Sequence, residues 1–124
     1  MSDVQILVVE DDPDGADMVK MMLSSAGVGT TLASSAEVAL ARIKGNSETY
    51  NAVIVDLALP EMDGFELLQA IRKQSLLNNV PLVAVTAYHT PELKVKALDA
   101  GFDAYFPKPL DTTIFLQSLE RLLQ

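Results

Sequence analysis

Charged and hydroxyl side chains stand at or just beyond the ends of several apolar runs in this chain. Five of them could do chemistry together: Glu10, Asp11, Asp56, Thr86 and Lys108. If the fold gathers them, the carboxylates repel one another, and a single lysine does not neutralise them. A hard divalent cation, Mg²⁺ or Mn²⁺, is therefore expected beside them. Carboxylates, cation and lysine together suit transfer of a phosphoryl group onto a carboxylate, which would give an aspartyl phosphate.

The elements that must position these side chains alternate along the chain. Strands are expected over Val4–Val9, Gly29–Ala33, Ala52–Val55, Pro81–Val85 and Asp103–Phe106. Three of these runs are aliphatic or β-branched throughout, which is typical of strands buried on both faces of a parallel sheet. The second and fifth runs carry this signal only weakly. Each strand is followed by a helical pattern, so we predict a flavodoxin-like, doubly wound (βα)5 α/β fold, with a parallel sheet in the order 2-1-3-4-5 and helices on both faces.

Helix signals separate the strands. The stripes expected to face the sheet are Ala16, Val19, Leu23 and Ala26; Ala36, Ala39, Leu40 and Ile43; Phe65, Leu68 and Ile71; and Phe115, Leu119 and Leu122. The expected start signals are a capping box at Ser34–Glu37, Asp63 with Gly64, Thr90 with Pro91, and Asp111. The expected stop signals are Gly27, Gly45 and Gly101. In such a fold, ligands bind beyond the carboxyl ends of the strands, where the five reactive side chains would meet.

Length and composition limit the function classes. The chain has 124 residues, which fits one domain over 1–124 without a linker. Its formal net charge of −8 argues against direct binding of nucleic acid or of an anionic membrane surface. Lack of cysteine excludes disulfides and thiolate chemistry, and no apolar run approaches the ~20 residues of a membrane span. A cytoplasmic location is expected.

Four segments together resemble a known family. The segments are Ile6–Asp12 (ILVVEDD), Val55–Gly64 (VDLALPEMDG), Val85–Ala87 (VTA) and Lys108-Pro109. In this order, at matching strand ends, they resemble the receiver domain of bacterial two-component response regulators, within the chemotaxis-regulator-like superfamily. The resemblance covers essentially the whole chain.

The resemblance implies a role for each site residue. Asp56 would accept a phosphoryl group from a histidine kinase or a histidine phosphotransfer protein, and Thr86 and Lys108 would contact the phosphoryl oxygens. The implied metal ligands are Asp11, Asp56 and the backbone carbonyl of Ala58, with Glu10 acting through water. Such a protein is a signalling phosphoacceptor that promotes its own phosphorylation and dephosphorylation, and is not an enzyme in the usual sense.

The resemblance also implies how the signal leaves the site. Tyr105 holds the aromatic switch position and would turn inward as the Thr86 hydroxyl moves toward the phosphate, which changes a face that binds a downstream protein or output domain. The Lys108–Pro109 peptide bond is expected to be cis. Tyr88 is large for its position and would shield the phosphoaspartate from water. His89 receives no role.

Three alternatives differ in chemistry. An aspartate-based phosphatase of the haloacid dehalogenase kind wants a second aspartate two residues after the first, where this chain has Ala58. A flavodoxin-like cofactor binder needs a phosphate loop after the first strand, and the acidic segment there would repel phosphate. A receiver fold that binds proteins without phosphorylation usually lacks one of the key positions, and none is missing here.

Overall fold

Strands and helices alternate through the whole chain. The computed structural model describes residues 3–46 and 50–124. The strands are β1 (Gln5–Val9), β2 (Gly29–Ala33), β3 (Ala52–Asp56), β4 (Leu82–Thr86) and β5 (Ala104–Pro107). The helices are α1 (Pro13–Ser25), α2 (Ala36–Asn46), α3 (Gly64–Lys73), α4 (Pro91–Ala100) and α5 (Thr112–Leu122). The strands form one parallel sheet in the order β2-β1-β3-β4-β5, which confirms the predicted topology.

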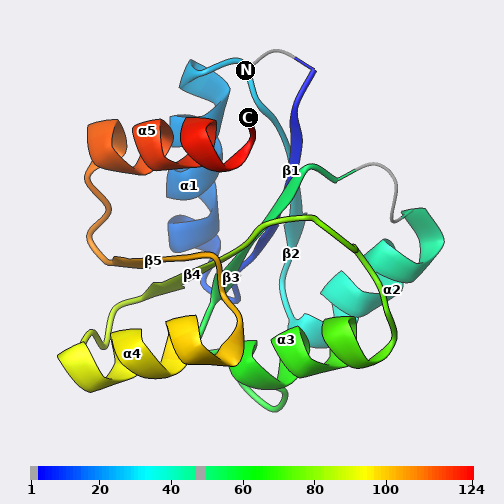
Figure 1. Ribbon diagram of the computed structural model, residues 1–124. Coiled ribbons are helices and arrows are strands. Elements are labelled where there is room, and N and C mark those ends of the chain that lie inside the picture. The colour runs from blue at the N-terminus through cyan, green and yellow to red at the C-terminus, as the bar shows by residue number, and fades with distance from the viewer. Residues whose placement is uncertain (1–2, 47–49) are drawn as a thin grey trace.

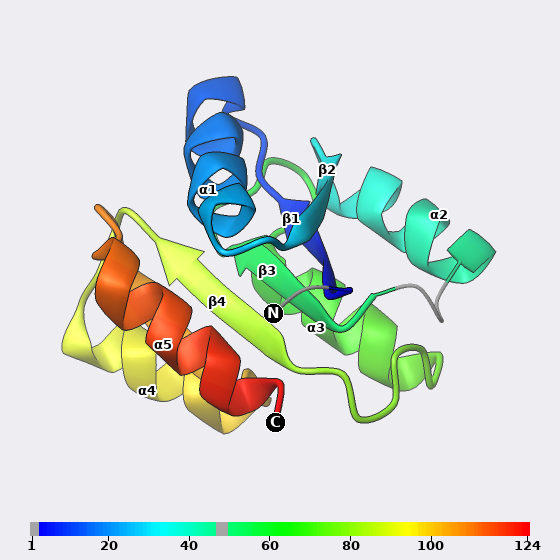
Figure 2. The ribbon, with the colours of Figure 1, turned by 90° about the horizontal axis from the view of Figure 1, so that it is seen from above.

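The helices cover both faces of the sheet. Figures 1 and 2 show α1 and α5 together on one face and α2, α3 and α4 on the other. Each face has its own apolar core: one includes Val19 and Leu23 of α1 with Phe115 and Leu119 of α5. The other includes residues of α2, α3 and α4, among them the fully buried Ile71. The domain is therefore a three-layer sandwich around the sheet.

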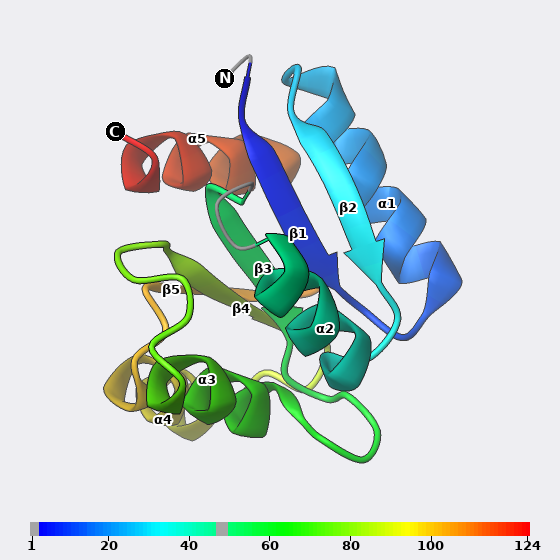
Figure 3. The same cartoon turned by 90° about the vertical axis from the view of Figure 1, so that its right-hand side faces the viewer.

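The central strands are the most deeply buried. Every residue of β3 and of β4 is buried, as their aliphatic runs predict. Figure 3 shows β1 and β2 running side by side with their arrowheads toward the same edge of the sheet. Both β3 and β4 extend one residue further than expected, so that Asp56 and Thr86 end the strands themselves. Asp56 pairs in register with Val85, and Thr86 pairs with Pro107.

The second helix departs from the prediction at both ends. The Ser34–Glu37 capping box is wrong: Oγ of Ser35 accepts a hydrogen bond from the N–H of Val38 at 3.1 Å. Two adjacent serines offer a cap, and the chain uses the second. The helix also passes through Gly45 instead of ending before it. A glycine in a helix interior lowers stability but does not end a helix by itself.

The third helix, and not the second, begins with a capping box. Oδ1 of Asp63 accepts from the N–H of Glu66 at 2.9 Å, and the Glu66 side chain accepts from the N–H of Asp63 at 3.2 Å. Leu67 is fully buried, whereas the predicted core residue Phe65 is only partly buried. Phe65 instead packs edge-on against Phe102 at a centroid distance of 6.0 Å.

The remaining caps follow the prediction. Thr90 caps α4 with Pro91 at its first position, and Asp111 caps α5. Gly27 and Gly101 end their helices with φ of +78° and +122°, a region of backbone conformation that favours glycine.

Candidate functional site

The carboxyl ends of the strands bring the predicted side chains into one crevice. Glu10 follows β1, Asp56 ends β3, Thr86 ends β4, and Lys108 follows β5. The backbone supports this convergence, because the N–H of Lys108 donates to the carbonyl of Thr86 at 2.8 Å. Glu10, Asp56 and Thr86 are 5%, 6% and 1% exposed, which is unusual for ionised or polar residues without partners.

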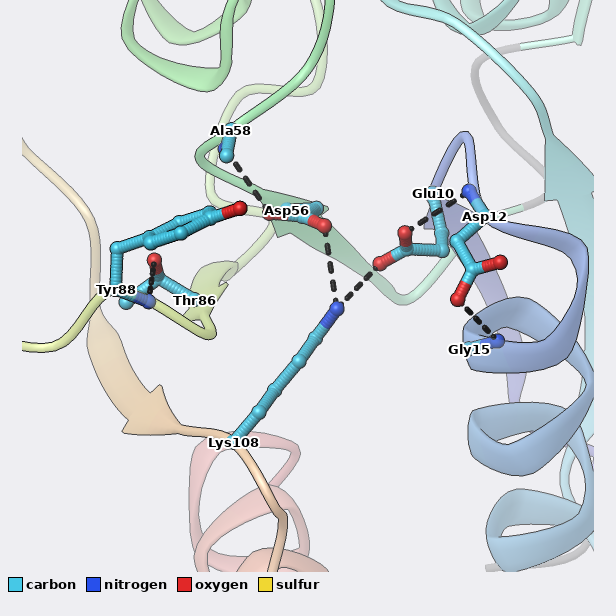
Figure 4. A network of polar contacts seen from close by, with 8 residues as sticks. All are labelled: Glu10, Asp12, Gly15, Asp56, Ala58, Thr86, Tyr88 and Lys108. Atoms are coloured by element: carbon cyan, nitrogen blue, oxygen red, sulfur yellow. Dashed lines mark hydrogen bonds and ion pairs between the residues drawn. The ribbon is translucent and has the colours of Figure 1, made fainter.

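Lys108 provides the partner for both buried carboxylates. Its Nζ lies 2.7 Å from Oε2 of Glu10 and 3.1 Å from Oδ2 of Asp56. Figure 4 shows the extended lysine side chain with its Nζ between the carboxylates of Glu10 and Asp56. Because the lysine side chain is 23% exposed, this bridged arrangement is shielded from water but still open to a ligand.

The charge balance of the site shows in two pKa values. Burial and a hydrogen bond with Asp56 raise the pKa of Glu10 to about 6, although hydrogen bonds from Lys108 and from the Asp12 N–H pull it down. Burial lowers the pKa of Lys108, but hydrogen bonds and Coulomb attraction from Glu10 and Asp56 outweigh it, so that the pKa is raised overall. Burial is therefore the main reason that Glu10 holds its proton more tightly than an exposed glutamate does.

Three acidic residues could hold a metal ion. Glu10, Asp11 and Asp56 each offer one carboxylate oxygen, and these oxygens lie within 4.8 Å of one another. Asp11 is exposed, and the other two are buried. An all-oxygen donor set with an open side suits Mg²⁺, which keeps waters and ligand oxygens in its coordination shell. The residues present therefore fit a divalent cation.

The backbone after β3 fixes the Asp56 carboxylate. The N–H of Ala58 donates to Oδ1 of Asp56 at 2.9 Å. The start of α3 lies close behind, because a Cβ at Gly64 would approach Cα of Leu57 to 2.8 Å and the carbonyl oxygen of Asp56 to 2.9 Å. Only glycine allows this approach, and the turn between Asp56 and α3 depends on it.

Thr86 and Tyr88 form the wall opposite Glu10. Oγ1 of Thr86 accepts from the N–H of Tyr88 at 3.0 Å. The Tyr88 side chain is 73% exposed. In Figure 4 its phenol ring extends past Thr86 in the direction of Asp56 and Ala58. The large side chain thus borders the crevice without closing it.

Known proteins are similar to this chain in sequence and in fold. A family model described as the response regulator receiver domain matches residues 6–120. An uncharacterised 14.6 kDa protein of Leptolyngbya boryana is 39% identical over 90% of this chain and 83% of its own length. The regulatory protein VanRB of Enterococcus faecalis is 35% identical over 98% of this chain, which spans about half, 53%, of that protein. The solved receiver domain of the Francisella response regulator 1452 has a TM-score of 0.87 at 30% identity, covering 97% of this chain and 96% of its own.

This chain belongs to the response regulator receiver domain family. Members of the family are signalling phosphoacceptors of two-component systems and not classical enzymes. Of its described residues, none forms a helix both long and apolar enough to cross a membrane.

Glu10, Asp56, Thr86 and Lys108, which the receiver resemblance singled out, lie in the crevice, and exposed Asp11 lies beside them. The neighbouring Asp12 caps α1 instead, because its Oδ2 accepts from the N–H of Gly15 at 3.2 Å. The Lys108–Pro109 bond is cis, the isomer that the resemblance implies. Ala58 contributes a backbone N–H to Asp56, and its methyl side chain offers no acid or base.

Tyr105 lies on β5 with only 7% of its surface exposed. Its hydroxyl lies 2.9 Å from Nδ1 of His89, a residue for which the sequence indicated no role. No signal in the sequence could have found this contact, because it joins a loop to a strand 16 residues away.

Proposed function

We propose that this receiver domain, spanning residues 1–124, accepts a phosphoryl group on Asp56 from the phosphohistidine of a histidine kinase or a phosphotransfer protein. The observation that carries the proposal is the setting of Asp56: a buried carboxylate 3.1 Å from Lys108, within 4.8 Å of oxygens of Glu10 and Asp11. A carboxylate held by a lysine beside a cation site is arranged for attack on phosphorus.

Phosphoryl transfer from the donor's phosphohistidine to Asp56 needs no further reactant. An oxygen of Asp56 forms the bond to phosphorus as the bond from phosphorus to the donor's imidazole nitrogen breaks, and that imidazole keeps the electron pair. Ala58 supports the attack, because its N–H holds Oδ1 of Asp56 and so leaves Oδ2 on the side of Lys108.

Three groups would stabilise the charge on the transferred group. Lys108 already contacts Asp56 and needs only a short movement to meet a phosphoryl oxygen. The Thr86 hydroxyl accepts one hydrogen bond here and keeps its own proton to donate. A Mg²⁺ or Mn²⁺ ion held by Asp11, Asp56 and the carbonyl of Ala58, with Glu10 through water, would supply the remaining positive charge.

The signal would leave through protein contacts. We propose that phosphorylation turns Tyr105 and changes the face formed by α4, β5 and α5, to which a downstream protein or output domain binds in the cytoplasm. The net charge of −8 disfavours direct contact with nucleic acid or anionic membranes.

Incubation with acetyl phosphate and Mg²⁺, followed by mass spectrometry of the intact protein, tests the proposal. Wild type should gain one phosphoryl group, Asp56→Asn should gain none, and EDTA should prevent the gain. Asp99→Asn is the matched control, because Asp99 is exposed on α4. Phosphorylation of Asp56→Asn to the same extent would contradict the proposal.

The same measurement separates the alternative function. If wild type gains no phosphoryl group and binds no beryllofluoride, the domain is a protein-binding module that works without phosphorylation. Release of phosphate from a free phosphomonoester with turnover would instead indicate the aspartate-based phosphatase.

A further inference from the structure

His89 and Tyr105 make a contact that joins two separate elements beside the crevice. Nδ1 of His89 lies 2.9 Å from the Tyr105 hydroxyl oxygen, which is hydrogen-bonding distance. The ring centroids lie 5.5 Å apart, with the planes tilted by 53°. Tyr105 is buried on β5, whereas His89 is exposed in the segment between β4 and α4. The contact therefore ties that segment to the edge strand of the sheet.

The segment that carries His89 is held at both ends. At its start, Oγ1 of Thr86 accepts from the N–H of Tyr88 at 3.0 Å. At its end, Oγ1 of Thr90 accepts from the N–H of Leu93 at 3.0 Å and caps α4. Because the cap anchors the α4 end, a change at Thr86 is taken up by the residues between, which include His89.

We propose that His89 is a positioning residue that couples the Thr86 side chain to the orientation of Tyr105. The inference rests on the proposed function, in which the Thr86 hydroxyl turns toward a phosphoryl oxygen. That rotation carries Oγ1 away from the Tyr88 N–H, which then needs another partner. The backbone between Thr86 and Thr90 must rearrange, and it carries His89 with it. Tyr105 then follows the imidazole or loses its hydrogen bond to His89.

The coupling does not depend on the protonation state of His89. The phenol hydroxyl donates to Nδ1 when that nitrogen is bare, and accepts from it when it carries a proton. Ring position therefore carries the coupling, and charge does not.

Nuclear magnetic resonance of the ring signals tests the contact directly. The chain has one histidine and three tyrosines, so these signals can be assigned with few variants. Tyr105→Phe should shift the ¹⁵N signal of His89 Nδ1. Tyr50→Phe is the matched control, since Tyr50 is also buried but lies just before the amino end of the central strand β3, away from His89. An unchanged Nδ1 signal in Tyr105→Phe would overturn the proposal.

Substitutions of Thr86 test the coupling without any ligand. Thr86→Ala removes the acceptor of the Tyr88 N–H and should displace the Tyr105 ring signals, whereas Thr86→Ser keeps the hydroxyl and should leave them near their wild-type values. In a His89→Ala background the displacement caused by Thr86→Ala should be lost, and His89→Gln should restore part of it. Equal displacement with and without His89 would show that Tyr105 responds by another route.

Beryllofluoride with Mg²⁺ separates this inference from the proposed function. In wild type the Tyr105 signals should respond, and His89→Ala should change the ratio of the two Tyr105 orientations by roughly 2- to 10-fold, as expected for one hydrogen bond. The same ratio in His89→Ala would overturn the coupling. If wild type does not respond at all, the proposed function fails, while the ligand-free Thr86 comparison still decides the role of His89.

Discussion

At the scale of single residues, the crevice combines two buried carboxylates with one positively charged lysine. Glu10 and Asp56 both contact Nζ of Lys108, so the lysine shares one positive charge between two carboxylates. Removal of the lysine should therefore destabilise the fold, because it leaves buried negative charge without a partner. A bound cation or phosphoryl group would change the charge balance among all three side chains.

Removal of the lysine charge is expected to destabilise the domain. In EDTA, Lys108→Met should lower the free energy of unfolding by about 2 kcal/mol, because Glu10 and Asp56 are left facing each other. Addition of Mg²⁺ should recover part of this loss. Urea unfolding measures both effects, with Lys20→Met as control because Lys20 is exposed on α1. Equal stability of Lys108→Met and Lys20→Met would show that the lysine does not balance the two acids.

The raised pKa of Glu10 predicts a pH dependence of stability in the metal-free protein. Its pKa lies at about 6 in the folded chain, above the ordinary value of 4.5, so the folded chain binds the proton more tightly. This stabilisation is present in full below 4.5 and is lost as pH rises through about 6. We expect the free energy of unfolding, measured in EDTA, to decrease by on the order of 1–2 kcal/mol as the pH rises over this window. Glu10→Gln should flatten the dependence, and Glu120→Gln, at an exposed position, should not.

The Tyr88 side chain is expected to lengthen the life of the phosphorylated state. Its ring borders the crevice toward Asp56, where it would restrict the approach of water. Tyr88→Ala should dephosphorylate faster than wild type. If the ring raises the activation barrier for hydrolysis by about 1 kcal/mol, the rate should increase by roughly 3- to 10-fold. Decay of acetyl phosphate-labelled protein measures this, and Tyr88→Phe should behave like wild type. An unchanged rate in Tyr88→Ala would rule out shielding.

At the scale of elements, the strand ends and their turns place the site. The turn from β3 to α3 brings Gly64 so close to Leu57 and Asp56 that a Cβ has no room. Since the obstructing atoms are mostly backbone, they cannot move aside as a flexible side chain would. The position of Asp56 is thus coupled to the start of α3.

Substitution of Gly64 tests that coupling. Gly64→Ala should destabilise the domain by about 1–3 kcal/mol and weaken Mg²⁺-dependent beryllofluoride binding, because the Asp56 backbone must shift. Gly45→Ala is the matched control: nothing lies within 4 Å of its Cβ, and alanine in helix α2 should add about 0.5–1 kcal/mol. Chemical unfolding and a binding titration report the two effects. A neutral Gly64→Ala would contradict the close approach.

The elements also show how far sequence alone predicts this molecule. The aliphatic runs of β1, β3 and β4 and the caps at Thr90 and Asp111 are local signals, and the structure agrees with them. The predicted cap of α2 is wrong, because Ser34 and Ser35 are equivalent as caps until the path of the chain is known. Leu67 and Phe65 both fit a helical stripe, and only packing against the sheet selects Leu67.

Contacts between distant segments are the least predictable part of the site. The convergence of Glu10, Asp56 and Lys108 could be expected, because parallel strand ends meet at one edge. The bridging position of Lys108 depends on side-chain geometry that spacing does not contain. The same holds for His89, whose partner Tyr105 is reached only because β4 and β5 are neighbours.

At the scale of the whole molecule, the site lies where all three layers of the sandwich meet. Strands β1, β3 and β4 supply or lead into the acidic and hydroxyl groups, and these strands also form the centre of both apolar cores. A ligand that joins the strand ends therefore stabilises the entire fold and not one loop. Any ligand that binds the folded chain alone raises its stability by mass action.

Thermal unfolding with beryllofluoride and Mg²⁺ tests this linkage between site and fold. At a ligand concentration about 100 times Kd, folding should gain about 2.7 kcal/mol, which raises Tm by roughly 10 °C for a domain of this size. Mg²⁺ alone should raise Tm less, because the phosphoryl analogue adds contacts to Thr86 and Lys108. Asp56→Asn should lose the response to beryllofluoride, and Asp99→Asn should keep it. A wild-type Tm that stays constant across the titration would mean that this crevice does not join its strands through a phosphoryl group, whatever its acidic residues bind.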